Sequence, residues 1–249
     1  MSDVLCIIPA RKGSKGIPHK NKQLLADVPL VIFSIRSALQ AGIDGTRIVV
    51  SSDDEEILGY AKSWKVCPHR RPIELSMDES STEDCMIDAI DNAHYSGDIK
   101  SVLLLQPTSP IRFKDRISDA ITTYKNGDYD SLLSVTEMHP FFWNYQYDDK
   151  VKIESCVSSY APNSRPRRQC ISKYDIPYFE NGNLYITDID VLKNKHCRIG
   201  DKPYLYKISE LEAMQIDDPE QLKIIDIILS TSMGRFFRMS FKHESENKV

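Results

Sequence analysis

The sequence predicts an α/β protein in which a mostly parallel sheet is covered by helices. Short β-rich runs alternate with longer amphipathic runs along the first half of the chain. The expected strands are residues 4–8, 47–51, 101–106 and 131–136, and the expected helices are residues 30–41, 54–64, 82–95 and 113–125. This alternation favours a parallel sheet, because two parallel strands need a long crossover that a helix usually provides.

Individual runs support this interpretation. Residues 4–8 are all apolar and end at Pro9, which is typical of a buried strand. In residues 113–125, four apolar side chains fall on one helical face and indicate core packing. They are Ile117, Ala120, Ile121 and Tyr124.

Composition limits the possible partners. With 249 residues, of which 41% are hydrophobic and 27% charged, the chain can build one sizeable core. The net charge of -4 argues against nucleic-acid binding by bulk electrostatics. Basic residues gather instead near residues 11–22, 65–71 and 165–173. Such local charge suits a small anionic ligand.

Cysteine spacing and hydropathy indicate a cytoplasmic protein without membrane contact. The six cysteines form no Cys-x-x-Cys pair and no zinc-like pattern, so we expect reduced thiols. The apolar opening is too short for a signal peptide, and no run approaches the roughly 18 apolar residues of a membrane span.

A basic, glycine-containing loop follows the first expected strand. Gly13 and Gly16 let backbone amides approach a ligand closely, and four basic side chains surround them. These are Arg11, Lys12, Lys15 and Lys20. The combination favours polyphosphate binding, although a solvated basic turn after an edge strand is the alternative. The spacing matches neither a P-loop nor a dinucleotide-binding fingerprint.

Residues 8–21 resemble the opening signature of the acylneuraminate cytidylyltransferase (CMP-sialic acid synthetase) family, Ile-Pro-Ala-Arg-x-Gly-Ser-Lys-Gly-Ile/Leu-Pro-x-Lys-Asn. Four further blocks follow in the family's order, at residues 48–55, 71–72, 104–112 and 181–186. The resemblance covers about residues 4–229. It implies a Rossmann-like, three-layer nucleotidyltransferase fold with a mostly parallel sheet and a small dimerisation insertion.

The resemblance also implies an activity. Members join CTP to a nine-carbon, sialic acid-like 2-keto acid sugar and release CMP-sugar and pyrophosphate, with Mg²⁺ as cofactor. Two alternatives stay open: a nucleotidyltransferase acting on a sugar phosphate, and a catalytically impaired nucleotide-binding regulatory protein. The sequence does not choose among the nonulosonic acids.

The expected organisation is a nucleotidyltransferase domain over residues 1–231, containing an insertion at 138–178, followed by a tail at 232–249. The insertion opens with Phe141, Phe142 and Trp143. These aromatic residues could cap the core, but aromatic residues are also favoured at association surfaces. The resemblance implies that the insertion reaches into a neighbouring active site, so we expect a homodimer.

Phosphate binding is expected at the basic loop. Arg11 and Lys20 are the best candidates for neutralising the triphosphate and thereby for catalysis. Amides around Ser14 to Gly16 would add donors, and Asn21 would contact the ribose or a phosphate. Lys15, like Lys12, is equally well explained as a ligand or as a solvated side chain. Gly13, Ser14, Lys15 and Gly16 complete the expected phosphate site.

The resemblance assigns cytosine contacts to Arg71 and Ser81. Each position also has a structural interpretation. Arg71 lies in a basic stretch where a surface role is common, and Ser81 precedes an expected helix that it could cap. Both interpretations remain open.

Three residues are candidates for the sugar site. Gln106 ends an expected parallel strand, at the edge where open α/β sheets bind ligands. Arg168 is the nominee for binding the sugar carboxylate, since guanidinium binds carboxylates with two parallel hydrogen bonds. Asn181 precedes Gly182 in a turn that would suit either a ligand-lining role or ordinary chain reversal. Arg112 is expected to secure the turn after Gln106.

The expected metal ligand is Asp217. The family carries Asp-x-Asp before its last helix, and this chain has Gln215-Ile216-Asp217. One carboxylate is compatible with Mg²⁺, because substrate phosphates and water can supply the remaining oxygen ligands. Asp218 followed by proline is typical of a helix N-cap, which makes it a weaker metal candidate.

Overall fold

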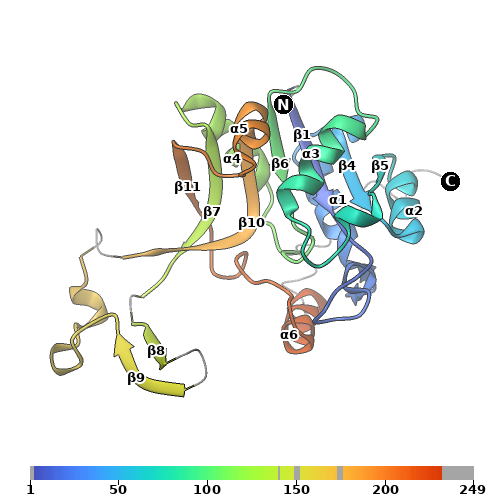
Figure 1. Ribbon diagram of the computed structural model, residues 1–249. Helices are drawn as coiled ribbons and strands as arrows, with labels where there is room; N and C mark the ends of the chain where they lie inside the picture. The colour runs from blue at the N-terminus through green and yellow to red at the C-terminus, as the bar shows by residue number, and fades with distance from the viewer. Residues whose placement is uncertain (1–2, 140, 149–151, 173–175, 232–249) are drawn as a thin grey trace.

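A seven-stranded sheet forms the centre of the molecule (Figure 1). The computed structural model describes residues 3–139, 141–148, 152–172 and 176–231. The sheet order is β11-β7-β10-β6-β1-β4-β5, and β10 is antiparallel to both of its neighbours whereas the other pairs are parallel. The strands are β1 (Val4–Pro9), β4 (Ile48–Ser52), β5 (Cys67–Arg70), β6 (Ser101–Leu104), β7 (Ser131–Glu137), β10 (Tyr178–Asp188) and β11 (Pro203–Lys207).

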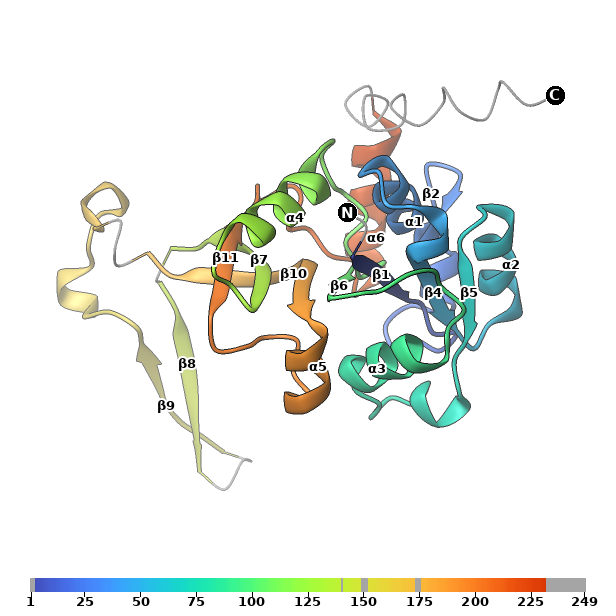
Figure 2. The same ribbon diagram turned by 90° about the horizontal axis from the view of Figure 1, so that it is seen from above.

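Helices cover both faces of this sheet, which gives three layers (Figure 2). The helices are α1 (Leu30–Gln40), α2 (Glu55–Ser63), α3 (Thr82–Asn92), α4 (Arg116–Asn126), α5 (Ile189–Lys195) and α6 (Pro219–Ser230). One buried cluster joins α1, α2 and α4 to one face, and a second joins α3 and α5 to the other. The predicted Rossmann-like, three-layer fold with a mostly parallel sheet is therefore confirmed.

Element boundaries differ from the predictions by a few residues. The predicted helix 113–125 begins only at Arg116, because Asp115 has a left-handed backbone with φ of 65°. The predicted helix 82–95 ends at Asn92. The predicted core face of α4 is confirmed, because all four of its apolar side chains are buried: Ile117, Ala120, Ile121 and Tyr124.

The predicted insertion leaves the sheet between β7 and β10. It contains the hairpin β8 (Trp143–Asp148) and β9 (Lys152–Ser158), followed by two short 3₁₀ turns, and it projects away from the sheet in Figures 1 and 2. The predicted tail at 232–249 lies outside the described residues.

The buried Arg112 connects three elements, as predicted for the turn after β6. Its Nη2 donates to the Gln106 and Asn183 carbonyl oxygens at 3.0 and 2.8 Å. Its Nε donates to Asn183 Oδ1 at 3.1 Å and its Nη1 to Ser34 Oγ at 3.1 Å. The end of β6 is thereby fixed against β10 and α1.

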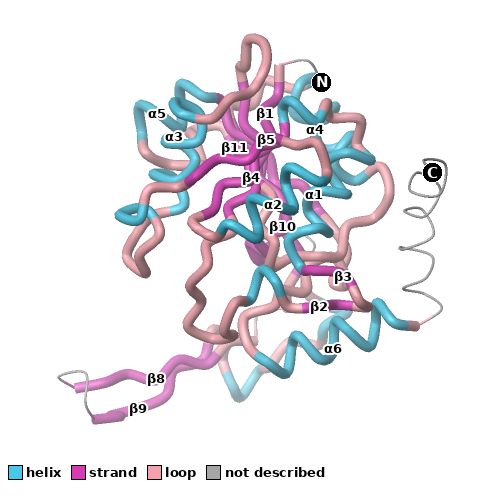
Figure 3. Tube along the Cα trace, turned by 90° about the vertical axis from the view of Figure 1, so that its right-hand side faces the viewer, coloured by secondary structure: helices cyan, strands magenta, loops and turns pink. Residues whose placement is uncertain are grey.

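A third apolar cluster attaches α6 and the small hairpin β2 (Leu24–Leu25) and β3 (Val28–Pro29) to α1 (Figure 3). Asp218 caps α6 with a capping box that includes Gln221, so its predicted N-cap role is confirmed. The turn before α6 packs tightly on the basic loop. A Cβ at Gly16 would lie 2.1 Å from the Asp217 carbonyl oxygen.

This contact predicts different effects at the two loop glycines. Gly16→Ala should lower the free energy of unfolding by about 1–3 kcal/mol, the usual range for overpacking. A Cβ at Gly13 has nothing within 4 Å, so Gly13→Ala is the matched control and should leave stability nearly unchanged. Urea unfolding of both variants measures this. Equal stabilities of the two variants would contradict the close approach of the loop to residue 217.

Candidate functional site

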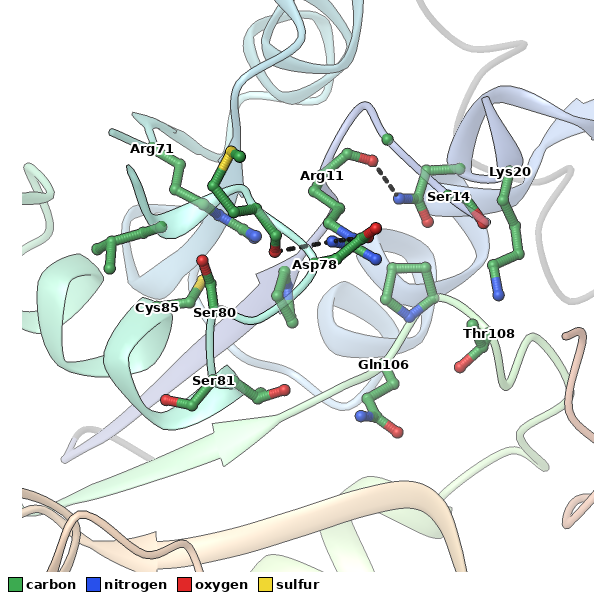
Figure 4. A pocket seen from close by; sticks show the side chains of 17 residues that line it. Arg11, Ser14, Lys20, Arg71, Asp78, Ser80, Ser81, Cys85, Gln106 and Thr108 are labelled. Carbon is green, nitrogen blue, oxygen red and sulfur yellow. Dashed lines mark hydrogen bonds and ion pairs between the residues drawn. The ribbon is translucent and has the colours of Figure 1, made fainter. Parts of the chain in front are cut away.

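A cavity of about 270 Å³ opens at the carboxyl ends of β1, β5 and β6 (Figure 4). This is the edge where open α/β sheets bind ligands. The structure brings together the following predicted residues along its wall: Arg11, Gly13, Ser14, Lys20, Asn21, Arg71, Ser81 and Gln106. Predicted residues that lie far apart in the sequence, such as Arg11 and Gln106 at a separation of 95 positions, thus line one site.

The conformation of the basic loop is set by its backbone partners. The Lys12 amide donates to Asp53 Oδ1 at 2.7 Å, and the Ala10 amide donates to the Ser51 carbonyl at 2.9 Å. Asn21 is buried, and its Nδ2 donates to the Arg11 carbonyl at 2.9 Å. The Asn21 side chain therefore braces the loop from the cavity wall, and its predicted contact with ribose or phosphate remains a prediction.

Arg11 and Lys15 converge on a carboxylate that sequence reasoning missed. Arg11 Nη1 lies 2.9 Å from Asp78 Oδ1 and donates to the Met77 carbonyl at 2.8 Å. Lys15 Nζ lies 3.2 Å from Asp78 Oδ2. Hydrogen bonds and charge from Lys15, and then from Arg11, hold the pKa of Asp78 below its usual range. The position of Asp78 in the sequence could have indicated this role, because residues 71–81 link a parallel strand to a helix at the edge of the sheet where ligands bind.

Lys20 lies at the junction of the loop and the turn before α6. Its Nζ donates to the Ile216 carbonyl at 2.9 Å and to Asp217 Oδ1 at 3.1 Å. The Lys20 side chain is only 14% exposed, whereas that of Asp217 is 62% exposed. A cation held in place with an accessible carboxylate beside it can serve both a phosphate and a hard metal ion.

Ser81 and Arg71 lie on the opposite side of the cavity. Ser81 Oγ caps α3 by accepting from the Asp84 amide at 2.9 Å, and it also lines the cavity. Arg71 is 6% exposed, so the surface alternative considered for it is wrong. Its guanidinium is directed toward the middle of the cavity in Figure 4.

The side chains of Gln106 and Gln215 both approach Gly182, which has φ of 68°. A Cβ on Gly182 would lie 2.3 Å from Gln215 Nε2 and 2.6 Å from Gln106 Oε1. Gln215 Nε2 also donates to the Asn181 carbonyl at 2.6 Å. The glutamine that replaces the family's first acidic residue therefore fastens the turn before α6 to β10.

Two predicted sugar ligands are not among the residues that line this cavity. The Asn181 side chain is buried, where it accepts from Ser134 Oγ at 2.7 Å and donates to Thr136 Oγ1 at 2.9 Å. Its hydrogen bonds hold β10 to β7, which gives it a structural role. Arg168 is exposed in the insertion, beyond the cavity wall.

The described residues contain no group of three or more His, Cys, Asp or Glu side chains that could hold a metal ion. A cation at this site would depend on Asp217 for its protein ligand and on a bound ligand for most of its oxygens. Within the described part of the chain, no helix is long and apolar enough to cross a bilayer.

Comparisons with known proteins show the family to which the chain belongs. The profile of the cytidylyltransferase family matches residues 5–224. The chain is 31% identical over 214 residues to N-acylneuraminate cytidylyltransferase A of Danio rerio, covering 86% of this chain and 48% of that protein. It is 28% identical over 248 residues to N-acylneuraminate cytidylyltransferase of Streptococcus agalactiae serotype V (strain ATCC BAA-611 / 2603 V/R), covering 98% of this chain and 56% of that protein. The chain thus spans about half the length of these two relatives.

A solved structure supports the fold. CMP:2-keto-3-deoxy-manno-octonic acid synthetase, complexed with CTP, superposes with a TM-score of 0.65 at 16% identity, covering 92% of this chain and 99% of that chain. The family profile extends from β1 into α6 and includes the segments that build the cavity. The chain therefore belongs to the cytidylyltransferase family.

Proposed function

We propose that this protein is a cytidylyltransferase that joins CTP to a nine-carbon, sialic acid-like 2-keto acid sugar. The observation that carries the proposal is the division of one cavity into a cationic wall, with Arg11 and Lys20, and a facing wall with Arg71 and Ser81. The names of the two curated relatives support the choice of substrates. We place the reaction in the cytoplasm, because the cysteine pattern favours a reducing compartment.

The cationic wall would bind the triphosphate. Arg11 and Lys15 share Asp78, so phosphate oxygens would replace this carboxylate as their partner. Lys20, already held by the Ile216 carbonyl, would contact the phosphates with little loss of side-chain freedom. These positive charges stabilise negative charge that develops on the leaving pyrophosphate.

The reaction requires the sugar on the side of Gln106. The anomeric oxygen of the sugar would form a bond to the α-phosphorus of CTP, while the bond between that phosphorus and the oxygen bridging to the β-phosphorus breaks. Pyrophosphate leaves with this bridging oxygen, and the hydroxyl proton passes to solvent or a base. Gln106 lines the cavity beside Thr108, and its backbone is fixed by Arg112. Gln106 would thereby offer the acceptor a contact at a fixed position.

Mg²⁺ would be held by Asp217 together with the phosphates of CTP. The exposed carboxylate of Asp217 beside Lys20 fits a hard cation that takes most of its oxygen ligands from substrate and water. When bound, the ion would neutralise part of the phosphate charge. The carboxylate also orients Lys20 through the contact of 3.1 Å.

We further propose that the active form is a homodimer in which the insertion of one protomer completes the other's site. Large apolar side chains are exposed on the hairpin and at the start of β10. They are Phe142, Trp143, Tyr145, Tyr178 and Phe179. Arg168, on the same insertion, would then bind the sugar carboxylate in the partner's cavity.

A substrate panel tests the central proposal. Purified protein is incubated with CTP, UTP, GTP or ATP and with 2-keto acid sugars or sugar phosphates, and pyrophosphate release is measured. We expect release only with CTP and a nine-carbon 2-keto acid sugar. Preference for a sugar phosphate would contradict the proposal.

Arg11→Ala should lower turnover by about 10²-fold, as expected for removing a preorganised cation. Arg70→Ala is the matched control, because Arg70 pairs with Glu55 and is not among the residues lining the cavity.

The metal proposal predicts that Asp217→Asn loses most activity and needs a higher Mg²⁺ concentration for half its maximal rate. A neutral amide is a weaker ligand for a hard cation than a carboxylate. Glu220→Gln, an exposed carboxylate change in the first turn of α6, serves as control. Titration of initial rate against Mg²⁺ distinguishes the two variants. An Asp217→Asn enzyme with wild-type rate and metal dependence would show that Asp217 has no part in metal binding.

The dimer proposal predicts twice the chain mass in light scattering of dilute protein. Trp143→Asp should shift the mass toward the monomer, because a charge would be buried in an apolar interface. Leu24→Asp changes an equally exposed apolar residue on β2, and it should leave the mass unchanged. A fully active wild-type monomer would overturn this assignment of the insertion.

A further inference from the structure

Behind Arg71 lies a buried polar chain that the proposed reaction does not itself use. Arg71 Nη2 donates to the Ser51 carbonyl at 2.8 Å, and Arg71 Nε donates to Ser51 Oγ at 3.2 Å. His69 Nδ1 lies 3.1 Å from the same Ser51 oxygen. His69 Nε2 lies 3.3 Å from Asp88 Oδ2. β4, β5 and α3 each contribute to this chain.

The positions of the protons in this chain follow from the chemistry of its first member. A guanidinium only donates, so Ser51 Oγ accepts from Arg71 and its own hydroxyl proton is available to another acceptor. His69 Nδ1 is the stronger acceptor nearby, since the alternative is the Cys85 sulfur at 3.5 Å. With Nδ1 accepting, Nε2 carries the proton on the side of Asp88, whose Oδ2 lies 3.3 Å away without hydrogen-bond geometry. One direction of donation therefore runs from Arg71 through Ser51 to His69, and Asp88 contacts the far side of the imidazole.

Burial limits the protonation states and the hydrogen-bond partners open to these side chains. Ser51 is fully buried and His69 is 5% exposed. Asp88 Oδ2 is buried and makes no hydrogen bond to the described residues, and it contacts His69 Nε2 at 3.3 Å. Desolvation, and then the charge of Arg71, lower the pKa of His69 against the opposing effect of Asp88, so the imidazole is neutral at pH 7.

A fixed guanidinium can distinguish pyrimidines. Cytosine presents two adjacent acceptors, O2 and N3, whereas uracil carries a proton on N3. A guanidinium edge donates to both cytosine atoms but meets a second donor in uracil. A mismatch of this kind is costly because it leaves buried polar groups unpaired. The contacts with Ser51 engage Nε and Nη2, whereas Nη1 takes no part in them, and Arg71 lines the cavity.

We propose that Ser51, His69 and Asp88 are positioning residues that fix the Arg71 guanidinium for reading cytosine and thereby set the preference for CTP over UTP. This inference rests on the proposed function, because it assumes that the base lies against Arg71. It assigns specificity to side chains that do not line the cavity.

The test compares two neighbouring serines of β4. Ser51→Ala should raise the KM for CTP and reduce the ratio of kcat/KM for CTP to that for UTP, each by about tenfold, the effect of losing one charge-assisted hydrogen bond. Its kcat at saturating CTP should change less than threefold. Ser52 is equally buried, but its Oγ donates to the Ala10 carbonyl of the basic loop. Ser52→Ala should therefore keep the wild-type CTP to UTP ratio.

Two further measurements exclude a general loss of structure. The inhibition constant of pyrophosphate reports on the cationic wall and should be unchanged in Ser51→Ala. Asp88→Asn, at the α3 end of the chain, should reduce the CTP to UTP ratio in the same direction by a smaller factor. It carries the test alone if Ser51→Ala does not fold.

The outcomes distinguish a failure of the proposed function from a failure of the role assigned to Ser51, His69 and Asp88. Wild-type protein without a preference for CTP would overturn the proposed function and this inference with it. A wild-type preference that persists unchanged in Ser51→Ala and Asp88→Asn would overturn the inference alone. So would an equal loss of the CTP to UTP ratio in Ser51→Ala and Ser52→Ala.

Discussion

The geometry of the site depends on one buried cation that does not line the cavity. Arg112 is 7% exposed, and burial lowers its pKa to about 10, so the guanidinium stays charged at neutral pH. A buried charge is costly unless hydrogen bonds compensate it. Acceptors from Gln106, Asn183 and Ser34 do so, and their positions are fixed in return. The end of β6, the middle of β10 and α1 are thus held at one point.

A second set of ion pairs organises the phosphate side. Arg11 and Lys15 are held by Asp78, and Lys20 is held by Asp217. Mutual repulsion among these cations is offset by carboxylates that the triphosphate can replace as partners. The site is therefore preorganised for several negative charges before the nucleotide arrives. Tight packing of Gly16 on residue 217 keeps the two sets of charges together.

Local patterns in the sequence were sufficient for several of these features. The basic loop, the cap at Asp218 and the role of Arg112 in its turn were predicted from spacing and residue type, and the structure confirms the last two directly. The fold class followed from the alternation of strands and helices. The family resemblance assigned Arg71 and Ser81, and the end of an expected parallel strand indicated Gln106; all three line the cavity.

Features that depend on long-range contacts were not predictable in this way. Asp78 meets Arg11 across 67 positions, and no local motif marks that pairing. Gln215 was interpreted as a lost metal ligand, yet its amide fastens the turn before α6 to β10. The sequence around Asn181 suited either a ligand or a structural turn, and only the neighbouring strand shows that its side chain bonds to Ser134 and Thr136. The antiparallel direction of β10 likewise appears only in its pairing with β6 and β7.

The measurement that tests this account most directly is a crystal structure of the protein with CTP. We predict triphosphate oxygens within hydrogen-bonding distance of Arg11 and Lys20, with Asp78 displaced from Arg11. The cytosine should lie against Arg71, and the side of the α-phosphate facing Gln106 should be open to a sugar. Nucleotide bound outside this cavity, or bound with the Arg11–Asp78 pair intact and the base away from Arg71, would contradict the account.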